Sequence, residues 1–219
     1  MTAPQEYRQF MTAHFSGLAL QKPVFYQGTY GLRVDLQVGE TNTDEYFRHV
    51  IGRATTLFEA AFAPDDRVLL LIRDYKYRRR KIRFGNFVHR QIRGLVKGEL
   101  TYTKTGGFYD PSRVWNQEFI RLPAHRIAHQ QVLTAIAHAD FPPRAPRFSG
   151  RGLWQAPELY FLNLDRALIF HMYDDRGLDL IAGDRQTLRP LYEQFNTWLL
   201  DYDRSRMDLM FKSDQERLS

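Results

Sequence analysis

Three short apolar segments near the end of the chain constrain the fold more than any other feature of the sequence. Residues 158–163, 167–173 and 178–183 each have the length and composition of a β-strand, and only a few polar residues separate them. Such short connections are typical of hairpins between antiparallel strands. A helical apolar pattern follows, and Thr187 is its expected N-cap because this choice places Pro190 in the first turn. An antiparallel meander followed by a helix predicts an α+β fold.

The rest of the chain supplies the other elements of this fold. Hydrophobic residues make up 43% of the sequence, which is enough for a substantial core. We therefore predict a single α+β domain over residues 1–219, with a mostly antiparallel sheet of about six strands packed by four or five helices. A Gly- and Pro-rich stretch at 141–152 is a candidate mobile loop. The remaining strands are expected at 30–38, 67–75, within 99–110 and at 113–122, and helices at 5–18, 41–64 (N-cap Thr43), 82–97 and 123–140.

The composition excludes several classes of chemistry. The chain has no cysteine, so disulfides, thiolate metal sites and cysteine nucleophiles are excluded, and a reducing cytoplasm is the expected compartment. The first residues lack the basic and apolar blocks of a signal peptide. No apolar run approaches the roughly 18 residues that a membrane span needs. We therefore expect a cytoplasmic protein without a membrane span.

Positive charge is concentrated in one part of the chain. Residues 67–113 contain 13 basic and 3 acidic residues, whereas residues 157–219 contain 8 basic and 12 acidic residues. If 82–97 is helical, its basic and apolar residues fall on opposite sides. A cationic face of this kind could bind an acidic protein, nucleic acid or anionic lipid headgroups, or simply be solvated. Its candidate contact residues are Arg78, Arg79, Arg80, Arg83, Arg90, Arg93 and Lys97.

The segment "YDDRG", residues 173–177, is predicted to be a hairpin turn. Aspartate side chains accept hydrogen bonds from nearby backbone N–H groups, and Gly177 would supply a positive φ. Two alternatives remain open. An arginine could clamp "YDDR" to "DYDR" (201–204), or carboxylates from both segments could bind a divalent cation in a metal-dependent hydrolase. The residues concerned are Asp174, Asp175, Arg176, Asp179, Asp201, Asp203 and Arg204.

Other catalytic signals are weak. His125 and His129 have the spacing of two metal ligands on one helix, but no third ligand accompanies them. The sequence contains no phosphate-binding glycine loop, nucleophile elbow or dinucleotide fingerprint. We therefore expect no bound metal and no cofactor, and the balance of evidence favours a protein that is not an enzyme.

The segments "ELYFLN", "IFHMYDDRGLDLIA" and "LRPLYEQFNTWLLDYDR" together resemble the bacterial family of domain of unknown function 3885, over residues 157–211. The resemblance implies a small bacterial protein and brings no catalytic residues. Together with the segregated charge, it leads us to expect a non-enzymatic protein that binds a specific protein partner, for example an immunity protein that neutralises a toxin. A nucleic-acid-binding protein that uses residues 76–97 is the main alternative.

Overall fold

The computed structural model describes residues 1–75, 82–106, 114–142, 144–148 and 156–211. Its centre is a seven-stranded sheet in the order β1-β7-β6-β5-β2-β4-β3, in which every neighbouring pair is antiparallel. The strands are β1 (Tyr30–Asp35), β2 (Arg67–Tyr75), β3 (Leu100–Gly106), β4 (Val114–Pro123), β5 (Glu158–Asn163), β6 (Leu168–Met172) and β7 (Gly177–Ala182). The predicted α+β class is confirmed, with seven strands rather than about six.

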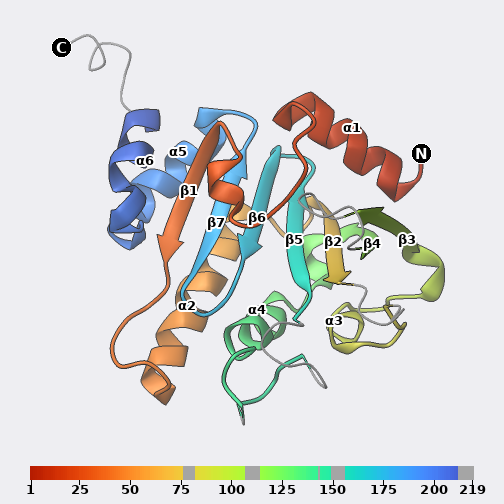
Figure 1. Ribbon diagram of the computed structural model, residues 1–219, viewed down its shortest axis with the longest axis horizontal. Coiled ribbons are helices and arrows are strands. Elements are labelled where there is room, and N and C mark those ends of the chain that lie inside the picture. The colour runs from red at the N-terminus through yellow and green to blue at the C-terminus, as the bar shows by residue number, and fades with distance from the viewer. Residues whose placement is uncertain (76–81, 107–113, 143, 149–155, 212–219) are drawn as a thin grey trace.

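Helices cover both faces of the sheet (Figure 1). α2, α4 and α5 pack on one face, and α1 packs on the other. The α-helices of the described part of the chain are α1 (Ala3–Phe15), α2 (Asp44–Ala61), α3 (Phe87–Arg90), α4 (His129–Ala137), α5 (Arg185–Gln194) and α6 (Arg204–Phe211). Single turns of 3-10 helix occur at η1 (Val24–Tyr26), η3 (Lys97–Glu99), η4 (Ala124–Arg126), η6 (Asn196–Trp198) and η7 (Asp201–Asp203). Within the described ranges, no helix is both long and apolar enough to cross a bilayer.

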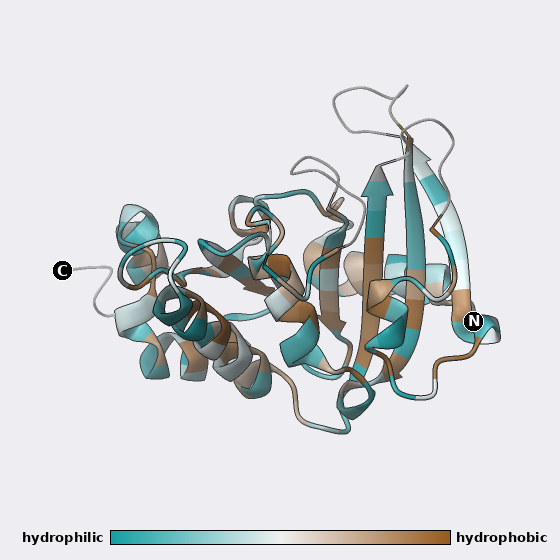
Figure 2. Ribbon diagram, turned by 90° about the horizontal axis from the view of Figure 1, so that it is seen from below, coloured by the Kyte–Doolittle hydropathy of each residue, from teal (hydrophilic) through white to brown (hydrophobic). Residues whose placement is uncertain are grey.

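The continuous apolar run of β2 follows from this two-sided cover. Leu69 and Leu71 pack toward α1, while Leu70 and Ile72 pack toward α2 and α4, because successive side chains of a strand point to opposite faces. Figure 2 shows the resulting apolar segments along the strands. The strand is therefore buried on both sides, and its sequence does not alternate between apolar and polar residues.

One predicted helix start is confirmed and another is wrong. The Thr43 hydroxyl accepts the Tyr46 N–H at 3.1 Å, as expected of an N-cap. At α5 the N-cap is Asp184, whose carboxylate accepts the Thr187 N–H at 2.8 Å and the Thr187 hydroxyl at 2.9 Å. Because Thr187 donates to Asp184, it is not the cap. The helix begins three residues earlier than predicted, and Pro190 lies inside it.

The predicted helix over 82–97 is also wrong, since only the four residues of α3 are helical there. Gly85 and Gly94 have φ angles of +80° and +66°, which an α-helix cannot contain. Asn86 caps the short turn by accepting the His89 N–H at 3.0 Å. The helix expected over 123–140 is shortened to α4, because η4 precedes it. The candidate mobile loop at 141–152 falls partly outside the described residues, so its mobility stays a prediction.

Candidate functional site

The basic residues that follow β2 lie on an irregular surface rather than on one side of a helix. Arg83, Arg90, Arg93 and Lys97 are exposed, and Lys104 of β3 joins them. Arg78, Arg79 and Arg80 lie outside the described residues. Three large apolar side chains are exposed on the same segment, Phe84 by 47%, Val96 by 59% and Tyr102 by 45%. We call these eight residues the basic surface: Arg83, Phe84, Arg90, Arg93, Val96, Lys97, Tyr102 and Lys104.

A buried histidine–glutamate pair attaches α3 to the sheet. His89 Nε2 lies 2.7 Å from Glu118 Oε1 of β4, and the two side chains are 2% and 0% exposed. The Gly85 N–H donates to His89 Nδ1 at 3.0 Å, which fixes the orientation of the ring. Partial burial and the negative charge of the nearby Glu118 carboxylate raise the pKa of Tyr102 to about 12. The Phe84 ring lies 5.6 Å from the His89 ring, so Tyr102, Glu118, His89 and Phe84 form one connected group.

A second contact attaches the end of the basic surface. Arg126 forms a two-pronged ion pair with Glu99, with N–O distances of 2.6 and 3.1 Å. The Arg126 Nε–H also donates to the Arg93 carbonyl at 2.9 Å. Hydrogen bonding from Arg126 is the main reason that the pKa of Glu99 is lowered. Since Arg126 already neutralises this carboxylate, Glu99 does little to offset the cations of the basic surface.

The segment "YDDRG" forms the hairpin turn between β6 and β7, as predicted. The Asp174 carboxylate accepts the Arg176 N–H at 2.8 Å and its Nε–H at 3.0 Å. The expected reason for the glycine was wrong, however, because Gly177 does not have a positive φ. A Cβ at this position would overlap the Tyr173 hydroxyl and lie 2.7 Å from the Val34 carbonyl oxygen. Lack of space, not backbone conformation, requires Gly177.

The carboxylates of the hairpin do not converge on one site. Asp175 accepts the Tyr46 hydroxyl at 2.5 Å beside α2. Asp179 points to the other face of the sheet, where it accepts the Phe25 N–H at 3.1 Å. Asp174 is bonded within its own turn, and Asp201 is exposed. Across the described ranges, no three metal-ligating side chains gather into a possible metal site. The predicted carboxylate cluster for a metal-dependent hydrolase is therefore wrong.

The predicted arginine tie between "YDDR" (173–176) and "DYDR" (201–204) is wrong, and an arginine outside both segments instead joins Asp203 to Asp179 of β7. Arg33 of β1 lies 3.1 Å from Asp179 and 3.3 Å from Asp203, and the Tyr26 hydroxyl bonds Asp203 at 3.0 Å. Burial raises the pKa of Asp179 to about 6, although Arg33 opposes this shift. By contrast, Arg176 bonds Asp174, and Arg204 donates to the Asn196 side chain at 2.9 Å.

Sequence reasoning missed Arg33 because its strand alternates apolar and polar residues. In such a pattern, an arginine between Leu32 and Val34 is expected to face water. In the structure its side chain is largely covered and holds two buried carboxylates. The tie is thus a structural clamp between β1, β7 and η7, and it supplies no group that faces an open site.

His125 and His129 contact different acidic residues. The His125 ring contacts Asp65 at 3.3 Å, whereas His129 contacts Glu59 at 3.2 Å and stacks on Phe58. They do not share a metal position, because η4 ends before α4 begins.

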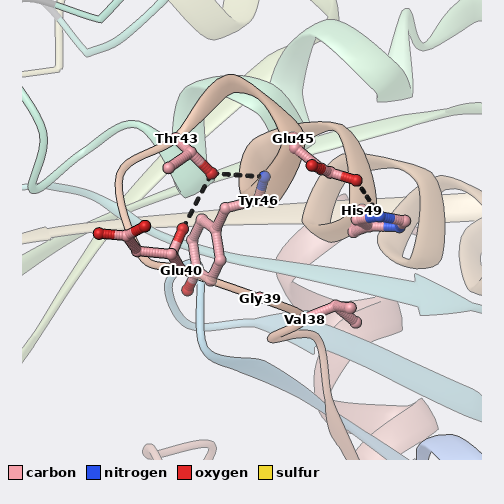
Figure 3. A pocket seen from close by; sticks show the side chains of 7 residues that line it. All are labelled: Val38, Gly39, Glu40, Thr43, Glu45, Tyr46 and His49. Atoms are coloured by element: carbon pink, nitrogen blue, oxygen red, sulfur yellow. Dashed lines mark hydrogen bonds and ion pairs between the residues drawn. The ribbon is translucent and has the colours of Figure 1, made fainter.

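A shallow pocket of about 190 Å³ lies at the start of α2 (Figure 3). It is smaller than the roughly 300–1,000 Å³ of typical ligand sites. Thr43 caps the helix and donates to the Glu40 carbonyl at 2.9 Å, and Glu45 lies 3.8 Å from His49. These contacts explain the polar lining as part of the helix start.

Comparisons with known proteins show the family of the chain and give no activity. Residues 7–203 match the family model described as domain of unknown function (DUF3885). Over 207 residues the chain is 25% identical to the uncharacterized protein YnaE of Bacillus subtilis (strain 168), covering 88% of this chain and 96% of that protein. No solved structure matches the chain. The family match therefore extends well before residues 157–211, over which the sequence motifs carry the resemblance.

Proposed function

The chain belongs to the DUF3885 family, whose description names no activity, and from its surface we propose that it is a non-enzymatic protein that binds an acidic protein partner. The contact region is the basic surface. The observation that carries the proposal is the presence of exposed cations and exposed large apolar side chains on one surface segment. Interfaces combine such apolar anchors with arginine and tyrosine, whereas a purely solvated charged surface needs no apolar anchors.

The apolar part of the basic surface is distinctive within the molecule. Seven large hydrophobic residues of the described chain are exposed, and three of them, Phe84, Val96 and Tyr102, belong to this surface. Covering them would remove apolar area from water and so favour association. The His89–Glu118 pair and the Arg126–Glu99 pair hold the segment in place, which lowers the entropic cost of binding.

A protein partner is favoured over nucleic acid by the apolar part of the basic surface. Val96 is the most exposed of the three apolar residues and has no ring on which a base could stack. A toxin neutralised by a bacterial immunity protein is one partner of the kind proposed.

Charge reversal with a matched control tests the proposal. The variant Arg83→Glu with Arg93→Glu changes the basic surface, and Arg8→Glu with Arg48→Glu makes the same charge change at exposed positions of α1 and α2. Tagged wild type and both variants would be used to capture proteins from a nuclease-treated lysate. Each captured protein would then be purified and titrated against all three forms by calorimetry at two salt concentrations.

We expect an acidic protein that binds the wild type and the control, and binds the Arg83/Arg93 variant at least about tenfold more weakly. Unchanged melting temperatures would show that the variants are folded. Equal binding of that protein to all three forms would refute the basic surface as the contact region. Salt-sensitive binding of RNA added to the purified chain, with no acidic protein captured from the lysate, would replace the proposal with nucleic-acid binding.

A further inference from the structure

The two edge strands of the sheet, β1 and β3, differ in the contacts that their outer backbone groups make. At β1, the Leu200 N–H donates to the Arg33 carbonyl at 2.9 Å, the Arg33 N–H reaches Met207 Sδ at 3.2 Å, and Val34 pairs with Leu199. β3 forms the opposite edge and, among the strands of the described residues, pairs with β4 alone (Figure 1). In the part of the chain that the structure describes, its outer side makes one backbone hydrogen bond, from the Leu100 N–H to the Lys97 carbonyl. With respect to the described residues, alternate backbone groups along β3 are thus available to another strand.

The side chains of β3 divide between two chemically distinct faces. Tyr102 and Lys104 are exposed on the face that carries Glu118, since Tyr102 stands opposite Glu118 in the register. Thr101, Thr103 and Thr105 are half-buried on the other face. Lys97 and Arg93 stand just before the strand and are exposed as well. A strand laid along β3 would therefore meet positive charge on one face and small β-branched side chains on the other.

We infer that the acidic partner binds by adding an extended segment to the sheet along β3, with acidic side chains beside Lys104 and Lys97 and apolar or β-branched side chains beside the threonines. This inference rests on the proposed function and specifies how that surface would be used. Backbone hydrogen bonds would hold the segment, and its alternating pattern would supply the specificity. Its recognisable sequence would alternate acidic and β-branched residues over about seven positions, the length of β3.

A second copy of this chain is a poorer occupant of the same edge. Pairing β3 with β3 would bring the Lys104 and Lys97 side chains of two molecules together, and like charges across strands are destabilising. A lysine on an edge strand is a common protection against self-association. The same charge attracts an acidic strand.

The test uses the full chain and the labelled peptide acetyl-(Glu-Val)4-amide. Two isomers carry N-methyl groups either on all four glutamates or on all four valines, so that each removes the backbone donors of one peptide edge. Binding would be followed by fluorescence anisotropy, and hydrogen–deuterium exchange would report on residues 100–106. The variant Lys97→Glu with Lys104→Glu and the control Arg8→Glu with Arg48→Glu would both be titrated with the glutamate peptide. The Lys97/Lys104 variant would also be titrated with the peptide acetyl-(Lys-Val)4-amide.

We expect the parent peptide to bind and to slow exchange in β3, and one N-methyl isomer to bind at least about tenfold more weakly while the other still binds. The Lys97/Lys104 variant should no longer bind the glutamate peptide and should instead bind the lysine peptide. If both isomers bind like the parent and exchange in β3 is unchanged, strand addition is refuted while the basic surface remains an acidic-binding surface. Absence of peptide binding, or a concentration-dependent dimer that protects β3 without peptide, would also overturn the inference. In either case, the lysate-derived partner still tests the proposed function.

Discussion

Replacing the buried His171 with phenylalanine should make the protein less sensitive to mild acid. His171 of β6 is 1% exposed on the α1 face of the sheet, stacked 4.3 Å from the Tyr160 ring. One ring nitrogen bonds the Leu159 carbonyl at 2.8 Å, and Nε2 is buried without a hydrogen-bond partner. Burial lowers the pKa of His171 from 6.5 to about 4. Folding therefore requires the neutral imidazole, and phenylalanine can keep the stacking without a titrating group.

The size of the effect follows from linkage between proton binding and folding. Because the pKa of His171 is lower in the folded state, the unfolded chain binds the proton more readily below pH 6.5. The stability that depends on the neutral ring is complete above pH 6.5 and is lost as the pH falls toward 4. With about 1.4 kcal/mol for each pKa unit, the loss is about 2 kcal/mol at pH 5 and about 3 kcal/mol at pH 4.

Urea unfolding of the wild type and His171→Phe at pH 7.5, 6.5, 5.5 and 5.0 measures this difference. Other groups titrate in the same range, including Asp179, so the prediction concerns the difference between the two proteins. That difference should move by about 2 kcal/mol in favour of the variant between pH 7.5 and 5.0. A His49→Phe variant, at an exposed position of α2, provides the matched comparison for the same substitution. Parallel curves for His171→Phe would refute the reasoning.

Three further predictions concern the clamp, the hairpin and α2, all measured by the free energy of unfolding in urea. Arg33→Met should lower the free energy of unfolding by about 3 kcal/mol because it leaves Asp179 buried without its cation. Adding Asp179→Asn to that variant should recover part of the loss. A cost below about 1 kcal/mol for Arg33→Met would contradict the clamp. Gly177→Ala should cost about 2 kcal/mol because its Cβ overlaps the Tyr173 hydroxyl, and a neutral result would show that the turn relaxes freely. Gly52→Ala, inside α2 with no atom near its Cβ, should instead stabilise the protein by roughly 0.5–1 kcal/mol, and any loss would reveal an unseen contact.

The basic surface shows that a helical pattern of apolar and basic residues does not by itself produce a helix. Residues 82–97 satisfy a helical pattern of apolar and basic positions, and yet only Phe87–Arg90 are helical. Gly85 and Gly94 interrupt the segment, but glycine also occurs inside helices, so the sequence did not reveal that both have a positive φ. What fixes the segment instead is the contact of His89 with Glu118, which lies far along the chain in β4.

The sequence by itself determined the elements whose signals are local. β2 and β5 occupy exactly the predicted residues, because a continuous apolar run bounded by polar residues records burial on both faces of a strand. The hairpin turn and the Thr43 cap were likewise set by neighbouring residues. Only the tertiary structure decided which distant groups meet, such as Arg33 with Asp203, 170 positions apart, and which strand lies at each edge of the sheet. Those outcomes depend on strand order and on the face to which each side chain points, and no local pattern encodes strand order.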